Sequence, residues 1–509
     1  MSHFPYLTVL TAAPLVGAAG VALLPKDKPE LAKRVALGWS VLVLALGVGL
    51  WTQFKPDGAR FQLRDSWTWI PQWGAKFTFA VDGIALVMIA LIALLVPLVI
   101  LASWHDAEHS KRSVSAYFAL LLALECTMIG VFAAQDVFLF YVFFEVMLVP
   151  MYFLIGSYGG QHKQYAAVKF FLYSLLGGLF MLAALIGLWV LGGQTFDWQT
   201  LVNADFSVNT ERWLFLGFFV AFAIKAPFFP FHTWLPDAGG AAPAGAAALL
   251  VGVLDKVGTF GILRYCLPLF PNASKDFAWL GLTLALVGII YGALVAIGQN
   301  DLKRLVSYTS IAHFGFIGIG VFAFTTQAGT GAVLYMVNHG LATGLLFLVV
   351  GMLVARRGSA LVTDFGGAGK LMPVLAGVFF IAGLASLALP GTSPFVSEFL
   401  VLIGTFTVNK TVAIVATAGI ILAAGYVLWM IQRTTQGTPN PKLAEIKAMG
   451  RDLSVREAVV VAPLIALILL LGFYPKPLTD VINPAVKATM QDVGKTDPKP
   501  TVGTVEAGK

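Results

Sequence analysis

The chain has 509 residues, of which 58% are hydrophobic and only 12% are charged, and its mean hydropathy is +0.83. Soluble globular domains carry about 25% charged residues, so this composition excludes an ordinary soluble protein. The net charge of +7 does not indicate a nucleic-acid partner either, because the basic residues gather in short loops between apolar runs.

These apolar runs recur along the whole chain, and each is about twenty residues long, which is enough to cross the hydrocarbon core of a bilayer. The sequence therefore predicts an all-α integral membrane protein with about fourteen transmembrane helices, surrounded by lipids. The expected helices lie near residues 4–24, 31–53, 80–103, 114–134, 137–157, 167–191, 212–230, 240–264, 277–297, 303–324, 330–354, 372–408, 412–432 and 455–473.

The first helix is expected to be retained, because the opening residues MSHFPYLTVL lack the basic leader and cleavage site of a signal peptide. With the N-terminus outside, the loops on the inner side carry the excess of Lys and Arg. The positive-inside rule then places both termini outside and the loop 433–456 in the cytoplasm. A bacterial plasma membrane is the expected location.

Three segments outside the helices have a character of their own. Residues 54–79 carry tryptophans at a membrane edge and alternate in a way that predicts a short hairpin. Residues 433–456 are polar and indicate a cytoplasmic linker or surface helix. The tail 475–509 is rich in Pro, Lys and Thr, which predicts a poorly ordered segment.

A weak internal repeat suggests how the helices are organised. The sequences IKAPFFPFHTWLP and LALPGTSPFVSEF each interrupt an apolar helix, and an odd number of helices separates them. Paired broken helices of this kind indicate an inverted repeat and a working site between the two units. The expected divisions are 1–113 with helices one to three, 114–265 and 266–433 as two inverted five-helix repeats, 434–474 as linker and helix fourteen, and 475–509 as an outside tail.

Several ionisable residues lie within the apolar helices, where each costs roughly 2.5–3.5 kcal/mol. Glu145 and Lys225 lie in otherwise apolar runs, Lys256 follows Asp255, and Glu398 follows the second helix break. Adjacent helical residues point about 100° apart, so the sequence does not make Asp255 the partner of Lys256. Structural ion pairs are one interpretation. The alternative is proton exchange, because burial favours the neutral forms of both Lys and Glu.

Two intramembrane histidines, His313 and His339, are candidates to bridge these charges, because imidazole both donates and accepts a proton near neutral pH. The alternatives are core residues that only form hydrogen bonds, or a pair of haem ligands. Glu125 is compatible with either a proton path or helix pairing. His232 and Asp237 lie near the expected cytoplasmic mouth, where they are either part of the path or interfacial polar groups.

No cofactor is expected in this chain. Phosphate-binding glycine motifs are absent from a strand–helix context. The two cysteines, Cys126 and Cys266, lie in apolar runs and are too few for an iron–sulfur cluster.

Around these residues the sequence resembles the antiporter-like membrane subunits of respiratory complex I, and most closely the M type, whose mitochondrial counterpart is chain 4 of NADH dehydrogenase. The motifs that carry the resemblance are WTWIPQWGAKFTFAVDGIAL, DVFLFYVFFEVMLVPMYFLIG, IKAPFFPFHTWLPDA, LLVGVLDKVGTFGILRY, DLKRLVSYTSIAHFGFIG, NHGLATGLLFLVVG and LPGTSPFVSEFL. Related L and N subunits and Mrp-type antiporter subunits typically carry a lysine where this chain has Glu398. The segment GGAAPAGAA after WLPDA departs from the pattern of many relatives.

The resemblance implies a proton-translocating subunit of an NADH:quinone oxidoreductase. Its proton path would run from Glu145 through Lys225, Lys256 and His313 or His339 to Glu398. Flavin, iron–sulfur clusters and quinone would then belong to partner subunits, and the direct partners would be neighbouring antiporter-like subunits. A subunit of an Mrp-type cation/proton antiporter or of a membrane-bound hydrogenase is the alternative.

Overall fold

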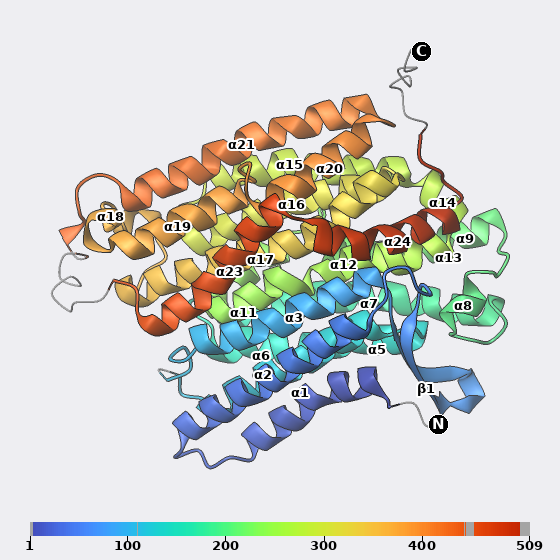
Figure 1. The fold of residues 1–509 in the computed structure, drawn as a ribbon, viewed down its shortest axis with the longest axis horizontal. Coiled ribbons are helices and arrows are strands. Elements are labelled where there is room, and N and C mark those ends of the chain that lie inside the picture. The colour runs from blue at the N-terminus through green and yellow to red at the C-terminus, as the bar shows by residue number, and fades with distance from the viewer. Residues whose placement is uncertain (1–3, 109, 442, 444–451, 499–509) are drawn as a thin grey trace, which may run out of the picture.

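The long helices lie side by side in one bundle, with a two-stranded hairpin at one end (Figure 1). The structure, a computed structural model, describes residues 4–108, 110–441, 443 and 452–498. The helices up to residue 276 are α1 Tyr6–Ala22, α2 Pro29–Gln53, α3 Gly83–Ala102, α4 Val114–Ala133, α5 Val137–Val146, α6 Leu148–Tyr158, α7 Lys163–Leu191, α8 Trp198–Leu201, α9 Val208–Lys225, α10 Trp234–Ala241, α11 Ala244–Leu249, α12 Lys256–Gly261, α13 Leu267–Leu269 and α14 Pro271–Asp276. The later helices are α15 Ala278–Ile297, α16 Leu302–Phe322, α17 Thr326–Arg357, α18 Ala368–Leu371, α19 Pro373–Ser386, α20 Ser393–Phe406, α21 Lys410–Thr435, α23 Val455–Phe473 and α24 Lys476–Asp492.

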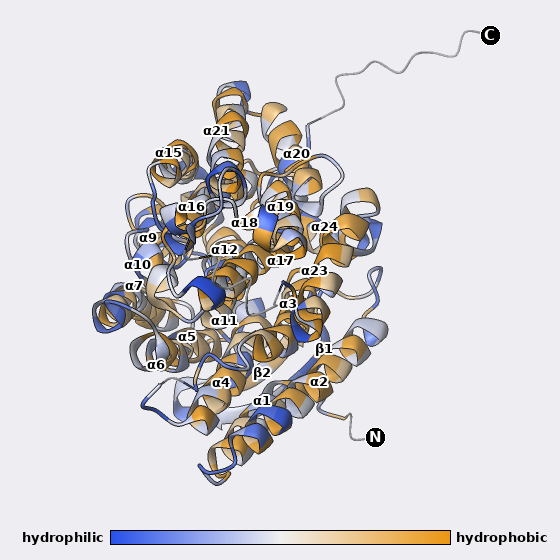
Figure 2. Cartoon of the chain, turned by 90° about the vertical axis from the view of Figure 1, so that its left-hand side faces the viewer, coloured by the Kyte–Doolittle hydropathy of each residue, from blue (hydrophilic) through white to orange (hydrophobic). Residues whose placement is uncertain are grey.

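The bundle has the dimensions and the surface of a membrane protein. Among the described residues, 11 helices are long and apolar enough to cross a membrane, and α1, α19 and α20 are shorter apolar helices. Figure 2 shows apolar residues along the helices and hydrophilic residues mainly in loops and at helix ends. Large apolar side chains remain exposed on the outward faces of α7 and α21, as lipid contact requires. The predicted all-α integral membrane fold is confirmed.

Both predicted helix breaks are present, and side chains satisfy the backbone at each of them. The first separates α9 from α10 and contains two prolines, which cannot donate a backbone hydrogen bond. There the indole Nε1 of Trp234 donates to the carbonyl of Ile224 at 2.9 Å. At the second break, between α19 and α20, Nδ2 of Asn338 donates to the carbonyl of Ser393 at 2.8 Å. Irregular backbone inside the bundle is therefore tolerated because protein groups replace the missing partners.

The helix that carries Lys256 is not a uniform α-helix. The segments Leu250–Leu254 and Ile262–Cys266 are π-helical and flank α12, which begins at Lys256. The sequence predicts one continuous helix over 240–264, and nothing in its apolar pattern signals the π-helical turns. Short π-helical segments occur frequently at functional sites.

The predicted hairpin in 54–79 is also present. Strand β1 Gln62–Ile70 pairs antiparallel with β2 Ala75–Val81. Gly74, with φ of 64°, ends the short 3₁₀ turn Pro71–Trp73 that connects the strands, in a backbone conformation that favours glycine. The carboxylate of Asp82 then caps α3 by accepting from the backbone N–H of Ala85 at 2.9 Å.

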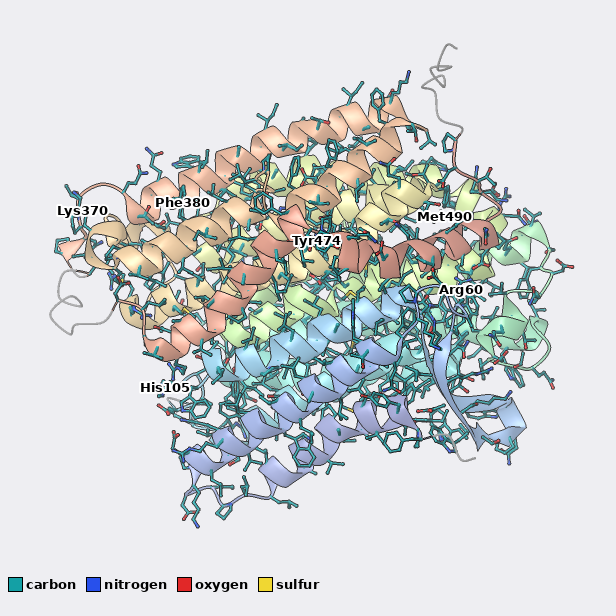
Figure 3. All side chains as sticks on the ribbon, viewed as in Figure 1. Arg60, His105, Lys370, Phe380, Tyr474 and Met490 are labelled. Atoms are coloured by element: carbon teal, nitrogen blue, oxygen red, sulfur yellow. The ribbon has the colours of Figure 1, made fainter. Side chains whose placement is uncertain are left out.

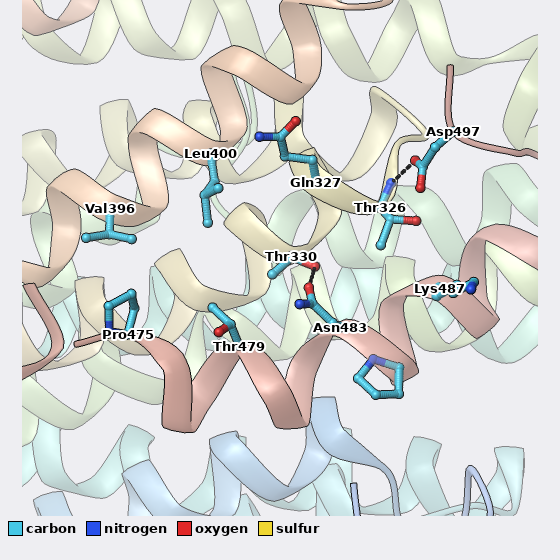
Figure 4. Close-up of a pocket in the computed structure, with 11 residues that line it drawn as sticks. Thr326, Gln327, Thr330, Val396, Leu400, Pro475, Thr479, Asn483, Lys487 and Asp497 are labelled. Atoms are coloured by element: carbon cyan, nitrogen blue, oxygen red, sulfur yellow. Dashed lines mark hydrogen bonds between the residues drawn. The ribbon is translucent and has the colours of Figure 1, made fainter. Parts of the chain in front are cut away.

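The expectation of a poorly ordered tail is wrong for residues 476–492, which form α24. Composition suggested disorder, but the apolar residues of this segment recur at helical spacing and are buried against α3 and α17. Figure 4 shows Asn483 of α24 accepting a hydrogen bond from Thr330, at 2.6 Å, beside a pocket of about 810 Å³ between α17, α20 and α24. Residues 499–509 of the predicted tail lie outside the described residues.

The two ends of the bundle carry different polar contacts. Figure 3 shows His105 and Lys370 at one end and Arg60 and Met490 toward the other. Near Met490, the guanidinium of Arg60 contacts the carboxylate of Asp492 at 2.6 Å and so joins the hairpin region to α24. The helices between these ends position the buried charges.

Candidate functional site

Glu145 lies at the end of α5, and its carboxyl group packs against α7. Helix α5 ends at Val146 and α6 begins at Leu148, with Met147 between them. Pro150, near the start of α6, has no backbone N–H to donate to the preceding turn, so the helix is interrupted here. A methyl group on Gly178 would lie 1.5 Å from Oε1 of Glu145, so this glycine leaves the space that the carboxyl group fills. Oε1 is buried and has no hydrogen-bond partner. The absence of a side chain at Gly178 therefore makes room for an acid.

Gly178→Ala should lower proton translocation on the order of tenfold, because it displaces a carboxyl group from its position. The measurement is proton pumping per assembled complex in membrane vesicles. Gly377→Ala is the matched control, since a methyl group there meets no atom within 4 Å. Wild-type pumping by a well-assembled Gly178→Ala complex would show that the position of Glu145 is unimportant.

Lys225 is the last residue of α9, directly before the first helix break, and it is 1% exposed. Its ammonium group has no hydrogen-bond partner and lies 5.1 Å from the centre of the Phe144 ring and 5.5 Å from that of Phe170. No ion pair within 4.0 Å joins it to Glu145, although the charges of Glu145 and Asp255 act on it through space. Glu145 and Lys225 therefore make no direct contact in this structure.

Lys256 lies at the centre of the best-connected cluster. Its Nζ is 3.0 Å from Oδ1 of Asp255 and 2.6 Å from Nδ1 of His339, and it also contacts the carbonyl of Val251. All three side chains are at most 1% exposed. The sequence argument that adjacent residues point apart did not identify Asp255 as the partner, because the long lysine side chain curls back at the π-helical turn.

Further contacts link the surroundings of His339, His313 and Glu398. The ring of His313 lies 5.2 Å from that of His339, centre to centre. On the far side, the hydroxyl of Tyr335 donates to Oε2 of Glu398 at 2.8 Å. The hydroxyl of Tyr426 is 3.5 Å from Nε2 of His313.

The sequence analysis left the role of Asp255 open and did not name Tyr335 or Tyr426. Tyr335 precedes His339 by one helical turn, so helical spacing alone places the two on the same face of α17. For Tyr426 the sequence contains no such signal, because α21 is apolar around it and its neighbours become known only from packing.

The remaining candidates fall outside this line of contacts. Both carboxyl oxygens of Glu125 are buried without a hydrogen-bond partner, so the structure gives no helix-pairing contact for it. Asp237 accepts from Lys169 at 2.8 Å and from Arg304 at 2.5 Å, next to a cavity of about 640 Å³. The ring of His232 packs edge-on against that of Tyr291 at 4.9 Å. Asp237 therefore has the ion pairs of an interfacial polar group.

The groups that lie close together are suited to proton transfer. Within the described residues no group of three His, Cys, Asp or Glu side chains has the geometry of a metal site. Cys126 and Cys266, which lie in apolar runs of the sequence, are buried and free. The aligned groups are amine, imidazole, hydroxyl and carboxyl, each of which takes up or releases a proton.

Comparison with known proteins identifies the family. The family model described as NADH:quinone oxidoreductase/Mrp antiporter, TM, matches residues 134–423. A relative from Mycobacterium tuberculosis, NADH-quinone oxidoreductase subunit M, is 48% identical and covers 99% of this chain and 97% of its own length. The chain belongs to the NADH:quinone oxidoreductase/Mrp antiporter membrane family. The resemblance inferred from the motifs is confirmed.

Two solved structures agree with the fold. A chain of respiratory complex I from Thermus thermophilus with bound NADH matches with a TM-score of 0.86 and 31% identity, over 96% of this chain and 100% of that one. A chain of the Mrp complex from Dietzia sp. matches with a TM-score of 0.84 over 96% and 100%, at 21% identity, which shows the shared fold alone.

Proposed function

We propose that the chain is the M-type, proton-translocating membrane subunit of an NADH:quinone oxidoreductase, complex I. The observation that carries this proposal is the buried cluster of Asp255, Lys256 and His339, with His313 packed beside His339. Buried charges of this kind are costly in a membrane, and proton relays are a principal reason for their presence. The relatives named NADH-quinone oxidoreductase subunit M, similar over nearly the whole chain, supply the context.

The proposed path runs from Glu145 to Lys225, then through Lys256, His339 and His313 to Glu398. Moving one proton against 100 mV takes about 2.3 kcal/mol, so the energy comes from redox chemistry in partner subunits that hold flavin, iron–sulfur clusters and quinone. Glu145 is the proposed residue through which partner subunits couple redox chemistry to proton transfer. Its side chain is half-buried, while those of Lys225 and Lys256 are buried. Neighbouring antiporter-like subunits are the proposed partners at that face.

We further propose that residues 114–265 and 266–433 are two inverted repeats in a bacterial plasma membrane, with both termini outside. The support is the helix break within each unit and the excess of Lys and Arg in the loops at the end where His105 and Lys370 lie (Figure 3). That end would face the cytoplasm.

Cysteines placed at Gly437 and Lys495 test the orientation. A membrane-impermeant thiol reagent should label Lys495→Cys from outside and Gly437→Cys only after the membrane is opened, because the two positions lie before and after the spanning helix α23. Labelling of both positions from the same side would contradict the proposed topology.

The function is tested by purifying the tagged chain from membranes. It should co-purify with subunits that carry flavin and iron–sulfur clusters, and its deletion should abolish NADH-driven, quinone-dependent proton pumping. A sodium-dependent antiport activity, and co-purification without any NADH-oxidising subunit, would instead assign the chain to an Mrp-type antiporter. Co-purification with a hydrogenase would assign it to that third class of assembly.

A further inference from the structure

The proposed path contains a gap between His313 on α16 and Glu398 on α20. No hydrogen bond among the described side chains joins these two residues directly. Two tyrosines from two other helices lie beside the gap, Tyr335 from α17 and Tyr426 from α21, and each is 1% exposed. The hydroxyl of Tyr426 faces Nε2 of His313 at 3.5 Å, and that of Tyr335 donates to Oε2 of Glu398 at 2.8 Å.

The contacts of these hydroxyl groups differ from those of tyrosines that only stabilise the fold. Tyr158 and Tyr265 are also largely or fully buried, and each donates to a backbone carbonyl, of Ser113 at 2.7 Å and of Ala134 at 3.1 Å. Tyr335 and Tyr426 instead contact ionisable side chains. The rings of His313 and Tyr335 lie 5.9 Å apart, centre to centre, so both tyrosines lie beside His313.

We propose that Tyr426 relays the proton from His313 to Glu398 and that Tyr335 positions the accepting carboxylate. This inference rests on the proposed function, since it concerns the last part of the same path. Neither tyrosine holds the transferred proton between steps. A phenol with an ordinary pKa near 10 stays neutral, while its hydroxyl donates one hydrogen bond and accepts others.

The transfer is balanced in atoms and charge. The N–H bond at Nε2 of the His313 imidazolium breaks as an O–H bond forms on Tyr426, and the original hydroxyl proton of Tyr426 passes to the Glu398 carboxylate. The imidazole becomes neutral, the carboxylate becomes a carboxylic acid and Tyr426 is unchanged. No electron moves. The hydrogen bond from Tyr335 occupies Oε2 and so fixes the orientation of the accepting group.

The test uses the assembled complex in membrane vesicles and follows NADH oxidation and proton pumping together. Tyr426→Phe, which removes one oxygen and keeps the ring, should lower protons pumped per NADH by about tenfold, less than the usual effect of a lost general acid because water partly replaces the hydroxyl. Pumping should also show a larger solvent deuterium isotope effect. Tyr335→Phe should have a smaller effect on pumping and change the isotope effect in the same direction. Tyr265→Phe is the matched control, since it loses a hydroxyl bonded only to backbone and should leave protons per NADH unchanged.

Two further variants separate the failure of this inference from the failure of the proposed function. If His313→Ala and Glu398→Gln abolish pumping while Tyr426→Phe pumps at the wild-type ratio, the tyrosine relay is wrong and the proposed function stands. If His313→Ala and Glu398→Gln themselves pump normally, the path is wrong and the relay with it. A Tyr426→Phe complex that assembles poorly but pumps normally per complex would also overturn the relay, because the hydroxyl would then be structural.

Discussion

Lys225→Ala is expected to lower NADH-driven proton pumping per assembled complex by about tenfold or more, while assembly stays near the wild-type level. The physical reason is that the ammonium group of Lys225 has no hydrogen bond and no ion pair within 4.0 Å to lose. Its ammonium group lies over the rings of Phe144 and Phe170, and each of these contacts is worth about 0.5–2 kcal/mol. Glu145→Ala should behave in the same way, and Glu145→Asp more mildly.

Arg264→Ala is the contrasting control. Arg264 and Asp82 form a fully buried ion pair at 2.6 Å outside the proposed path, and removal of one partner from such a pair costs about 3–5 kcal/mol. This variant should therefore lower the amount of complex. If Lys225→Ala reduces assembly as severely as Arg264→Ala, and the Glu145→Ala/Lys225→Ala double variant restores it, then Glu145 and Lys225 are a structural pair. Wild-type pumping by a well-assembled Lys225→Ala complex would refute the role assigned to that lysine.

Lys256→Met is expected to lower both assembly and pumping. The substitution leaves the carboxylate of Asp255, which is fully buried, without its partner at 3.0 Å, at a cost of about 3–5 kcal/mol. It also removes the proton donor that lies 2.6 Å from Nδ1 of His339. The amount of complex in membranes and the pumping per complex are measured separately.

The double variant Asp255→Asn/Lys256→Met separates the two effects. It removes both charges with nearly unchanged volume, so assembly should recover toward the wild-type level. Pumping per complex should stay as low as in Lys256→Met, because neither Asp255 nor Lys256 can then exchange a proton. Recovery of pumping together with assembly would show that the Asp255–Lys256 pair only stabilises the bundle.

The sequence by itself determined that the protein lies in a membrane, where two helices are broken, and which charged residues lie within apolar helices. Twenty-residue apolar runs have no stable place outside a membrane, so the helical bundle follows from composition and length. Proline cannot continue the backbone hydrogen bonds, so the interruptions after Lys225 and before Glu398 are local properties of the chain. A charged residue within an apolar run can be recognised from the sequence alone, because the free-energy cost of burying it comes from the membrane around it.

Only the tertiary structure decided which group each charge faces. Lys256 and His339 are 83 residues apart, and their contact depends on how two helices pack and rotate. The same holds for Tyr426 beside His313 and for Gly178 beneath Glu145. The tail shows this limit most plainly. The composition of residues 476–492 predicts a poorly ordered segment, yet α24 is stabilised by burial against α3 and α17, which lie far from it in sequence. Contacts between residues far apart in the sequence depend on how whole helices are placed, and the local sequence pattern does not specify that placement.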